Sequence, residues 1–165
     1  MNSAPIQRMS LAFLKAVIVF IGIGALAFLL WEPHVEGRNL HAKLFQIYFK
    51  DPFLAYVYIA SIPFFVALYQ AITLLTHIEK HTVFSQDSVR VVRTIQHCAG
   101  AIVAFALGAE AYIFLVQRGK DDIVGGVAMG LFVILASIVI AAAAAVLEKI
   151  LQRGVDVKAG KNLKV

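Results

Sequence analysis

Four long apolar stretches are the feature that most constrains how this chain can fold. They cover residues 9–31, 52–75, 95–116 and 123–147, and each is long enough to cross a bilayer, which needs about 20 mostly apolar residues. The chain is 61% hydrophobic and 15% charged, whereas soluble domains average about 45–50% apolar and about 25% charged residues. We therefore predict an integral membrane protein with a single domain over residues 1–165. Because Cys98 is the only cysteine, a disulfide scaffold is excluded.

All four stretches are predicted to be helices, because a segment that crosses lipid must satisfy its backbone hydrogen bonds internally. The first stretch has a basic start, as a signal peptide does. Its apolar run continues to Leu30, however, and Trp31-Glu32-Pro33 follows where a cleavage site would be expected. We interpret it as a retained helix. The predicted fold is all-α: a polytopic membrane protein with a four-helix transmembrane bundle.

Basic residues are unevenly shared between the two sides that four spans define. The side with both termini and the second connection has ten Lys and Arg residues, and the opposite side has five. The positive-inside rule then places both termini in the cytoplasm of a multi-pass protein of the inner cell membrane. The net charge of +5 is therefore interpreted as a sign of membrane topology. The basic side should also be attracted to anionic lipid. We predict contact with the lipid bilayer and no direct binding of nucleic acid.

The connections carry helix signals of their own. The outer connection, residues 32–51, has Leu40, Leu44 and Ile47 at helical spacing, which predicts a short amphipathic helix at the membrane interface. In the inner connection Ser85 is a good N-cap, and Asp87 favours a helix N-terminus. We expect one helix from Gln86 to about Val116.

The third and fourth helices are predicted to form a long antiparallel hairpin, because the connection between them is short. The fourth helix is expected to end at Gly154 as a C-cap, with residues 155–165 as a cytoplasmic tail. Counting back from the turn, Glu148 falls opposite Arg90 and Arg93. We predict an ion pair there and take these three residues as candidate contacts for a cytoplasmic partner.

Several short motifs give the chain a family resemblance. Phe84-Ser85 followed by Ser88-Val89, the run from Ala145 to Leu151, and the tail from Val157 to Val165 resemble segments of an uncharacterised bacterial family, domain of unknown function 2975. The tail departs from the family's acidic terminal motif at several positions. The resemblance implies a four-helix inner-membrane protein with no established activity or cofactor. Relatives are often encoded beside a small helix-turn-helix regulator, which implies a regulatory partner in the cytoplasm.

Glu110 is the first candidate for chemistry within the membrane. It lies six residues before the end of the third stretch, and an ionisable group at such a depth should face the bundle or a water cavity. One interpretation is a proton, cation or ligand site. The other is a packing residue hydrogen-bonded to Tyr56, Tyr58 or Ser61. These residues and Tyr112 complete the set of intramembrane polar candidates.

His77 and His81 are four residues apart, a spacing that can place two imidazoles on one metal ion. No cysteine or third histidine follows nearby, so we treat this pair as weak candidates and expect no metal site and no cofactor. A solvated helix end is the favoured explanation of the pair.

The residues of the sequence are compatible with two functions. The first is a non-enzymatic membrane sensor or regulatory partner that acts through its cytoplasmic hairpin and tail. The second is a small transporter or channel subunit coupled through Glu110, which would require a homo-oligomer or a water-filled cavity. An enzyme is the least favoured, because the sequence contains no phosphate loop, nucleophile elbow or pair of carboxylates.

Overall fold

The computed structural model describes residues 3–35, 52–116 and 123–162 of the chain. The second range includes the connection at 80–85. The regular elements in these ranges are α1 (Ser3–Val35), α3 (Pro52–Glu79), α4 (Gln86–Val116) and α5 (Ile123–Asn162). All four contain a segment long and apolar enough to cross a membrane: Arg8–Trp31, Ala55–Glu79, Gln86–Leu115 and Gly125–Gly160. The predicted all-α fold with four spanning helices is confirmed. The amphipathic helix predicted within 32–51 lies outside the described residues.

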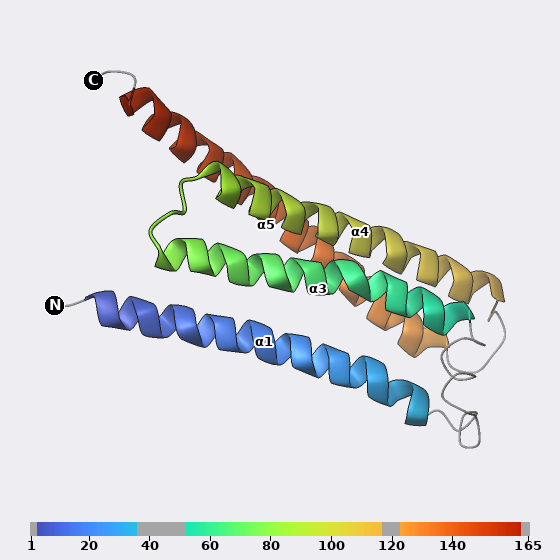
Figure 1. Ribbon diagram of the computed structural model, residues 1–165. Coiled ribbons are helices and arrows are strands. Elements are labelled where there is room, and N and C mark those ends of the chain that lie inside the picture. Colours follow the sequence, from blue (N-terminus) through green and yellow to red (C-terminus); the bar gives the residue numbers. More distant parts are fainter. Residues whose placement is uncertain (1–2, 36–51, 117–122, 163–165) are drawn as a thin grey trace.

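The helices run alongside one another, with α1 at one edge, α3 next to it, and α4 and α5 beyond (Figure 1). The α4–α5 pair makes the densest contacts, which confirms the long antiparallel hairpin. The N-terminus, the α3–α4 connection and the C-terminal part of α5 lie at the same end of the molecule (Figure 1). We call residues 77–93 together with 148–160 the hairpin end.

The tightest packing lies at and beside the hairpin end. Val89, Val92, Ala144 and Leu151 form one buried cluster, and Leu74, Val83, Ile95 and Val155 pack against it. Burial of apolar area is favourable by about 25 cal/mol per Å² where the alternative is water, but lipid offers no such drive. The close covering of these apolar side chains therefore fits an end of the bundle that meets water.

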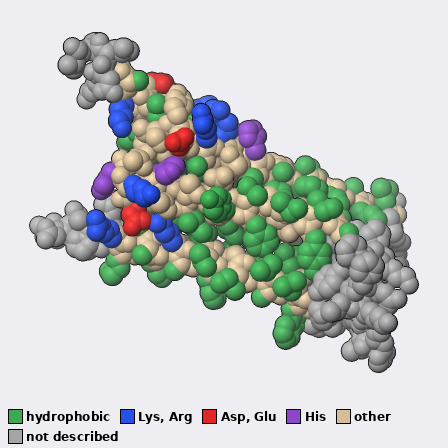
Figure 2. Space-filling model, viewed as in Figure 1, with side chains coloured by type: hydrophobic (Ala, Val, Ile, Leu, Met, Phe, Trp, Pro, Cys, Tyr) green, Lys and Arg blue, Asp and Glu red, His purple; other side chains and the backbone are tan. Residues whose placement is uncertain are grey.

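The opposite pattern holds along the spans. Large apolar side chains remain exposed over α1 and α5, among them Phe20, Phe28, Phe132 and Val139. On the face drawn in Figure 2, hydrophobic side chains cover the length of the bundle, and charged and histidine side chains gather at the hairpin end. This division fits a lipid-facing body with one water-facing end.

The start of α4 is built as the sequence predicts. The Ser88 amide N donates a hydrogen bond to Ser85 Oγ at 3.3 Å, so Ser85 caps the helix. Asp87 lies in the first turn, where its charge complements the helix dipole. The predicted helix from Gln86 to Val116 is confirmed.

The predicted end of the last helix at Gly154 is wrong. The helix α5 continues without interruption to Asn162. Gly154 is helical and lies against the Phe84 ring, so close that an added Cβ would overlap it. The glycine therefore provides room for an aromatic side chain from the α3–α4 connection. The helix is supported across this glycine, because Gln152 Nε2 donates a hydrogen bond to Asp156 Oδ1 at 3.0 Å.

Candidate functional site

The end of α3 is closed by a Schellman motif with a histidine at its left-handed position. The amide of His81 donates to Ile78 O at 3.1 Å, and the amide of Thr82 donates to His77 O at 2.9 Å. His81 has a φ of 55°, a conformation usually taken by glycine at this point. His81 thus serves the chain reversal, and this backbone role requires no metal ion.

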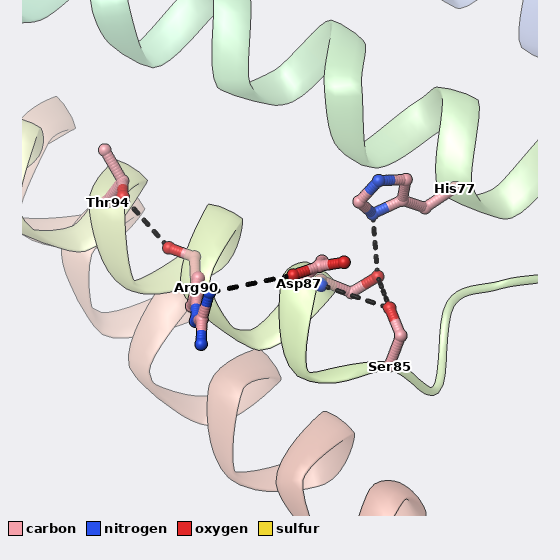
Figure 3. A network of polar contacts seen from close by, with 6 residues as sticks. His77, Ser85, Asp87, Arg90 and Thr94 are labelled. Carbon is pink, nitrogen blue, oxygen red and sulfur yellow. Dashed lines mark hydrogen bonds and ion pairs between the residues drawn. The ribbon is translucent and has the colours of Figure 1, made fainter.

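His77 belongs to a partly buried polar network at the same reversal (Figure 3). Its Nδ1 lies 2.8 Å from Ser88 Oγ, and Ser85 Oγ lies 3.1 Å from the same hydroxyl. Ser88 is fully buried. The network ties the last turn of α3 to the first turn of α4, so the two weak metal candidates have separate structural roles here.

The predicted ion pair across the hairpin is present. Arg93 Nη2 lies 2.7 Å from Glu148 Oε1, and Arg93 Nε donates to the same oxygen at 2.8 Å. Arg90 turns instead toward Asp87 on its own helix, at 3.9 Å and with both side chains largely exposed (Figure 3). Geometry therefore separates the three predicted partner contacts: Arg93 and Glu148 hold the hairpin, and Arg90 is free to meet another molecule.

A link between α1 and α3 was missed by the sequence analysis. Lys15 Nζ lies 2.6 Å from Glu79 Oε2, and toward the other ends of these helices Tyr58 donates its hydroxyl to Leu29 O at 2.7 Å. A lysine inside an apolar stretch was the available signal, because such a residue usually needs an acidic partner. The two contacts fix α1 along α3.

Glu110 points across the hairpin toward α5. Its carboxyl group lies against Gly130, where an added Cβ would overlap Oε1 and stand 2.7 Å from Cδ. Its Oε2 is buried. Within the described residues, it is the one buried side-chain nitrogen or oxygen atom without a hydrogen-bond partner. A charged carboxyl at this depth costs about 2.5 kcal/mol or more, and no neighbour that the structure describes offsets that cost.

The hydrogen bonds suggested for a packing role of Glu110 are not formed. Tyr56 donates to Phe105 O at 2.7 Å, Tyr58 to Leu29 O at 2.7 Å, and Ser61 to Tyr58 O at 2.7 Å. Each hydroxyl thus donates its proton to a backbone carbonyl, because a hydroxyl left without a partner in a span is costly. Tyr112, two residues from Glu110, lies on a different face of the helix.

A cavity of about 340 Å³ lies between α3, α4 and α5. Tyr56, Ala60 and Phe64 line it from α3, Phe105 and Ala106 from α4, and Gly130 from α5. Gly130 is also the residue on which the Glu110 carboxyl group rests. The hydroxyls of Tyr56 and Ser61, which line this space, are both used in hydrogen bonds to backbone carbonyls.

These features define a polytopic α-helical membrane protein with a packed, charged hairpin end and, within the part of the chain that the structure describes, a buried carboxyl oxygen of Glu110 without a hydrogen-bond partner. Residues 36–163 match the family model described as protein of unknown function (DUF2975), and the chain belongs to that family. The chain is also 41% identical, over 162 residues, to "Uncharacterized membrane protein YoaS" of Bacillus subtilis (strain 168). That match covers 96% of this chain and 99% of the relative. No solved structure matches the chain.

Proposed function

We propose that this integral membrane protein is a non-enzymatic sensor or regulatory partner that acts through its hairpin end. In this proposal the protein lies in the inner cell membrane with both termini in the cytoplasm, as the ten-to-five distribution of basic residues indicates. The partner is a cytoplasmic protein, for which a helix-turn-helix regulator is the first candidate. No cofactor or nucleic acid takes part directly.

The observation that carries the proposal is the packing of the hairpin end. Its core cluster and the fully buried Ser88 lie beside charged side chains that remain exposed. A rigid surface loses little conformational freedom on binding, so it binds partners at a lower entropic cost. The rest of the described surface is mainly apolar and suits lipid.

The chemistry of the surface indicates an acidic partner. Arg90, Lys149, Arg153 and Lys158 are exposed around the hairpin end. Complementary charge mainly speeds association and selects among partners. Arg90 and Arg153 are the residues to test, since neither belongs to the Arg93–Glu148 pair.

The test is photocrosslinking in the native bacterium. A photoreactive amino acid replaces Gln86 or Arg153 at the hairpin end, and matched reporters replace Phe132 or Val139, which are exposed along the span. We expect a discrete protein adduct from the hairpin positions that is absent from the span positions. Arg90→Glu in the crosslinking protein should weaken that adduct severalfold.

A matched control is Arg118→Glu, which makes the same charge change in the third connection. It should leave the adduct unchanged. An equal adduct from all four reporter positions, or an adduct unaffected by Arg90→Glu, would contradict the proposal. So would the recovery of lipid alone.

A second function, a small transporter or channel subunit coupled through Glu110, is favoured by the unpaired Oε2 in the span. Purified protein in liposomes would then conduct protons or a cation, and Glu110→Gln would abolish the flux. Glu148→Gln is the matched control, because it removes an acid outside the cavity. Equal flux in wild type and Glu110→Gln, or none in either, removes this candidate.

A further inference from the structure

The last part of α5 carries apolar side chains outside the stretch that lipid can cover. Residues 123–147 contain no charged side chain, whereas five charged residues follow from Glu148 to Lys158. The helix has 40 residues, which span about 60 Å, about twice the thickness of the hydrocarbon core. The part from Glu148 onward therefore stands beyond that core. Within it, Ile150 and Val157 are 54% and 64% exposed.

These two side chains and Phe84 form one surface, which we call the apolar patch. Gly154 lies four residues after Ile150 and three before Val157, so the three positions share one side of α5. The Phe84 ring lies against that glycine and is 51% exposed. The patch is thus built from two elements, the α3–α4 connection and α5. Exposed apolar surface with a polar border marks a site of interaction.

Basic side chains border the apolar patch on both sides. Arg153 and Lys158 are exposed, and a turn of about 100° per residue places them on opposite flanks of the patch. Asp156 is the one acid within residues 149–160, and it already accepts a hydrogen bond from Gln152 at 3.0 Å. The border is therefore positive, and its complement is an acidic segment.

An acidic helix fits this surface better than a second copy of the chain or the lipid does. Two copies inserted the same way would bring the same basic border together, and juxtaposed like charges are unfavourable. Lipid tails do not reach Val157, which lies about 14 Å past Glu148 along an uninterrupted helix. A partner helix with apolar residues seven positions apart matches the spacing of Ile150 and Val157.

We propose that the apolar patch is the docking site for an acidic amphipathic helix of the cytoplasmic partner. This inference rests on the proposed function and adds the anchor of the interface. Exposed charges such as Arg90 mainly set the rate and the selectivity of association. Removal of apolar surface from water is the main favourable term in protein association, so the affinity depends on the patch.

The test is photocrosslinking in the native bacterium with the reporter at Gln86. In that protein Ile150→Gln and Val157→Gln should each weaken the discrete adduct severalfold, and the double variant at least tenfold. Glutamine favours a helix but removes the apolar contact, whereas Val157→Ile keeps the contact and should retain the adduct. The matched control is Ala159→Gln, at an exposed position on the opposite side of α5, which should leave the adduct unchanged.

A second reporter identifies what covers the apolar patch. The photoreactive p-benzoylphenylalanine in place of Phe84 keeps an aromatic ring there, and tandem mass spectrometry of its adduct identifies the attached segment. We expect apolar residues at i, i+3 or i+4, and i+7 of that segment, with aspartate or glutamate between them. Thermal unfolding of each variant shows whether it remains folded. Val157→Gln, within a stretch exposed on all sides, carries the test if Ile150→Gln unfolds.

The outcomes separate this inference from the proposed function. A Gln86 adduct that both glutamine variants leave at the wild-type level would overturn the docking site and leave the proposed function standing. So would an equal loss of the adduct with Ala159→Gln. Attachment of the Phe84 reporter to lipid, to a second copy of the chain or to a basic segment would overturn the acidic helix. Absence of an adduct from both reporters removes both proposals.

Discussion

Two glycines of α5 show how the same residue type can have unlike roles. Gly154 lies against the Phe84 ring, whereas an added Cβ at Gly160 would meet nothing within 4 Å. We predict that Gly154→Ala lowers the free energy of unfolding by about 1 kcal/mol or more, because overpacking displaces the ring. Gly160→Ala should be neutral or slightly stabilising, because alanine favours a helix over glycine.

Thermal unfolding in detergent compares the two variants. The contrast between them matters more than either value, since both remove one glycine from the same helix. Equal stability of Gly154→Ala and Gly160→Ala would mean that Phe84 does not pack on α5 in the membrane-embedded protein.

Ser88 is the buried centre of the network at the α3–α4 reversal. Ser88→Ala would leave Nδ1 of His77 without the partner it has at 2.8 Å. The histidine is only partly buried, so the loss should be that of one ordinary hydrogen bond, about 0.5–1.5 kcal/mol. The control is Thr94→Ala, whose hydroxyl lies at an exposed position and donates to Arg90 O at 2.9 Å.

Thr94→Ala should change stability by no more than about 0.5 kcal/mol, as is usual for surface positions. Denaturant titration of both variants, followed by helical circular dichroism, measures the difference. Indistinguishable midpoints for Ser88→Ala and the wild type would contradict a structural role of the network.

At the scale of elements, an interhelical ion pair joins α4 and α5 near the charged end of the hairpin. Arg93 and Glu148 have side chains 54% and 19% exposed, so solvent screens the pair only in part. A double-mutant cycle with Arg93→Ala and Glu148→Ala should give a coupling of about 0.5–1 kcal/mol, typical of well-formed surface pairs.

Salt and a second pair provide the controls for this cycle. The coupling should fall as salt rises, because ions screen exposed charges. The Asp87–Arg90 contact is longer, at 3.9 Å, and both side chains are more than three-quarters exposed, so its coupling should be near zero. Equal coupling in the two cycles would show that the hairpin pair contributes nothing specific.

The whole molecule has an uneven distribution of charge along its length. Ten basic residues lie on the side of the termini and five on the other, and charged side chains gather at the hairpin end on the visible face (Figure 2). We predict that a fluorescent reporter fused to the C-terminus folds in the cytoplasm. Alkaline phosphatase inserted in the 117–122 connection should be active, because it is exported.

Reversing the bias tests the physical cause of this topology. Neutralising five exposed basic residues of the hairpin end, at Lys80, Arg90, Lys149, Arg153 and Lys158, should produce a mixed orientation. An active C-terminal phosphatase in the unaltered protein would place the hairpin end outside the cell and would remove the proposed cytoplasmic partner.

Much of the fold could be predicted because lipid imposes simple rules. Length and hydropathy of the stretches predict spanning helices, and the short connection predicts the antiparallel hairpin with Glu148 near Arg93. The end of α5 could not be predicted, since the same glycine serves as a C-cap or as space for a ring. That choice depends on where Phe84 lies, which is a long-range contact.

The candidate site was predicted less completely for the same reason. Glu110 stood out as an acid in an apolar stretch, and Tyr56 and Ser61 stood out as polar neighbours. Whether they bond to each other depends on interhelical distances. The structure instead pairs the hydroxyls with backbone carbonyls and places the acid on Gly130.

The sequence by itself determined that this chain is a four-helix membrane protein with a long hairpin, because solvation by lipid acts on each stretch independently. Tertiary structure alone decided that α5 continues past Gly154, that His77 joins Ser88, and that the Glu110 carboxyl group lies against Gly130. Those outcomes depend on which side chains meet across helices, and packing geometry sets that in three dimensions.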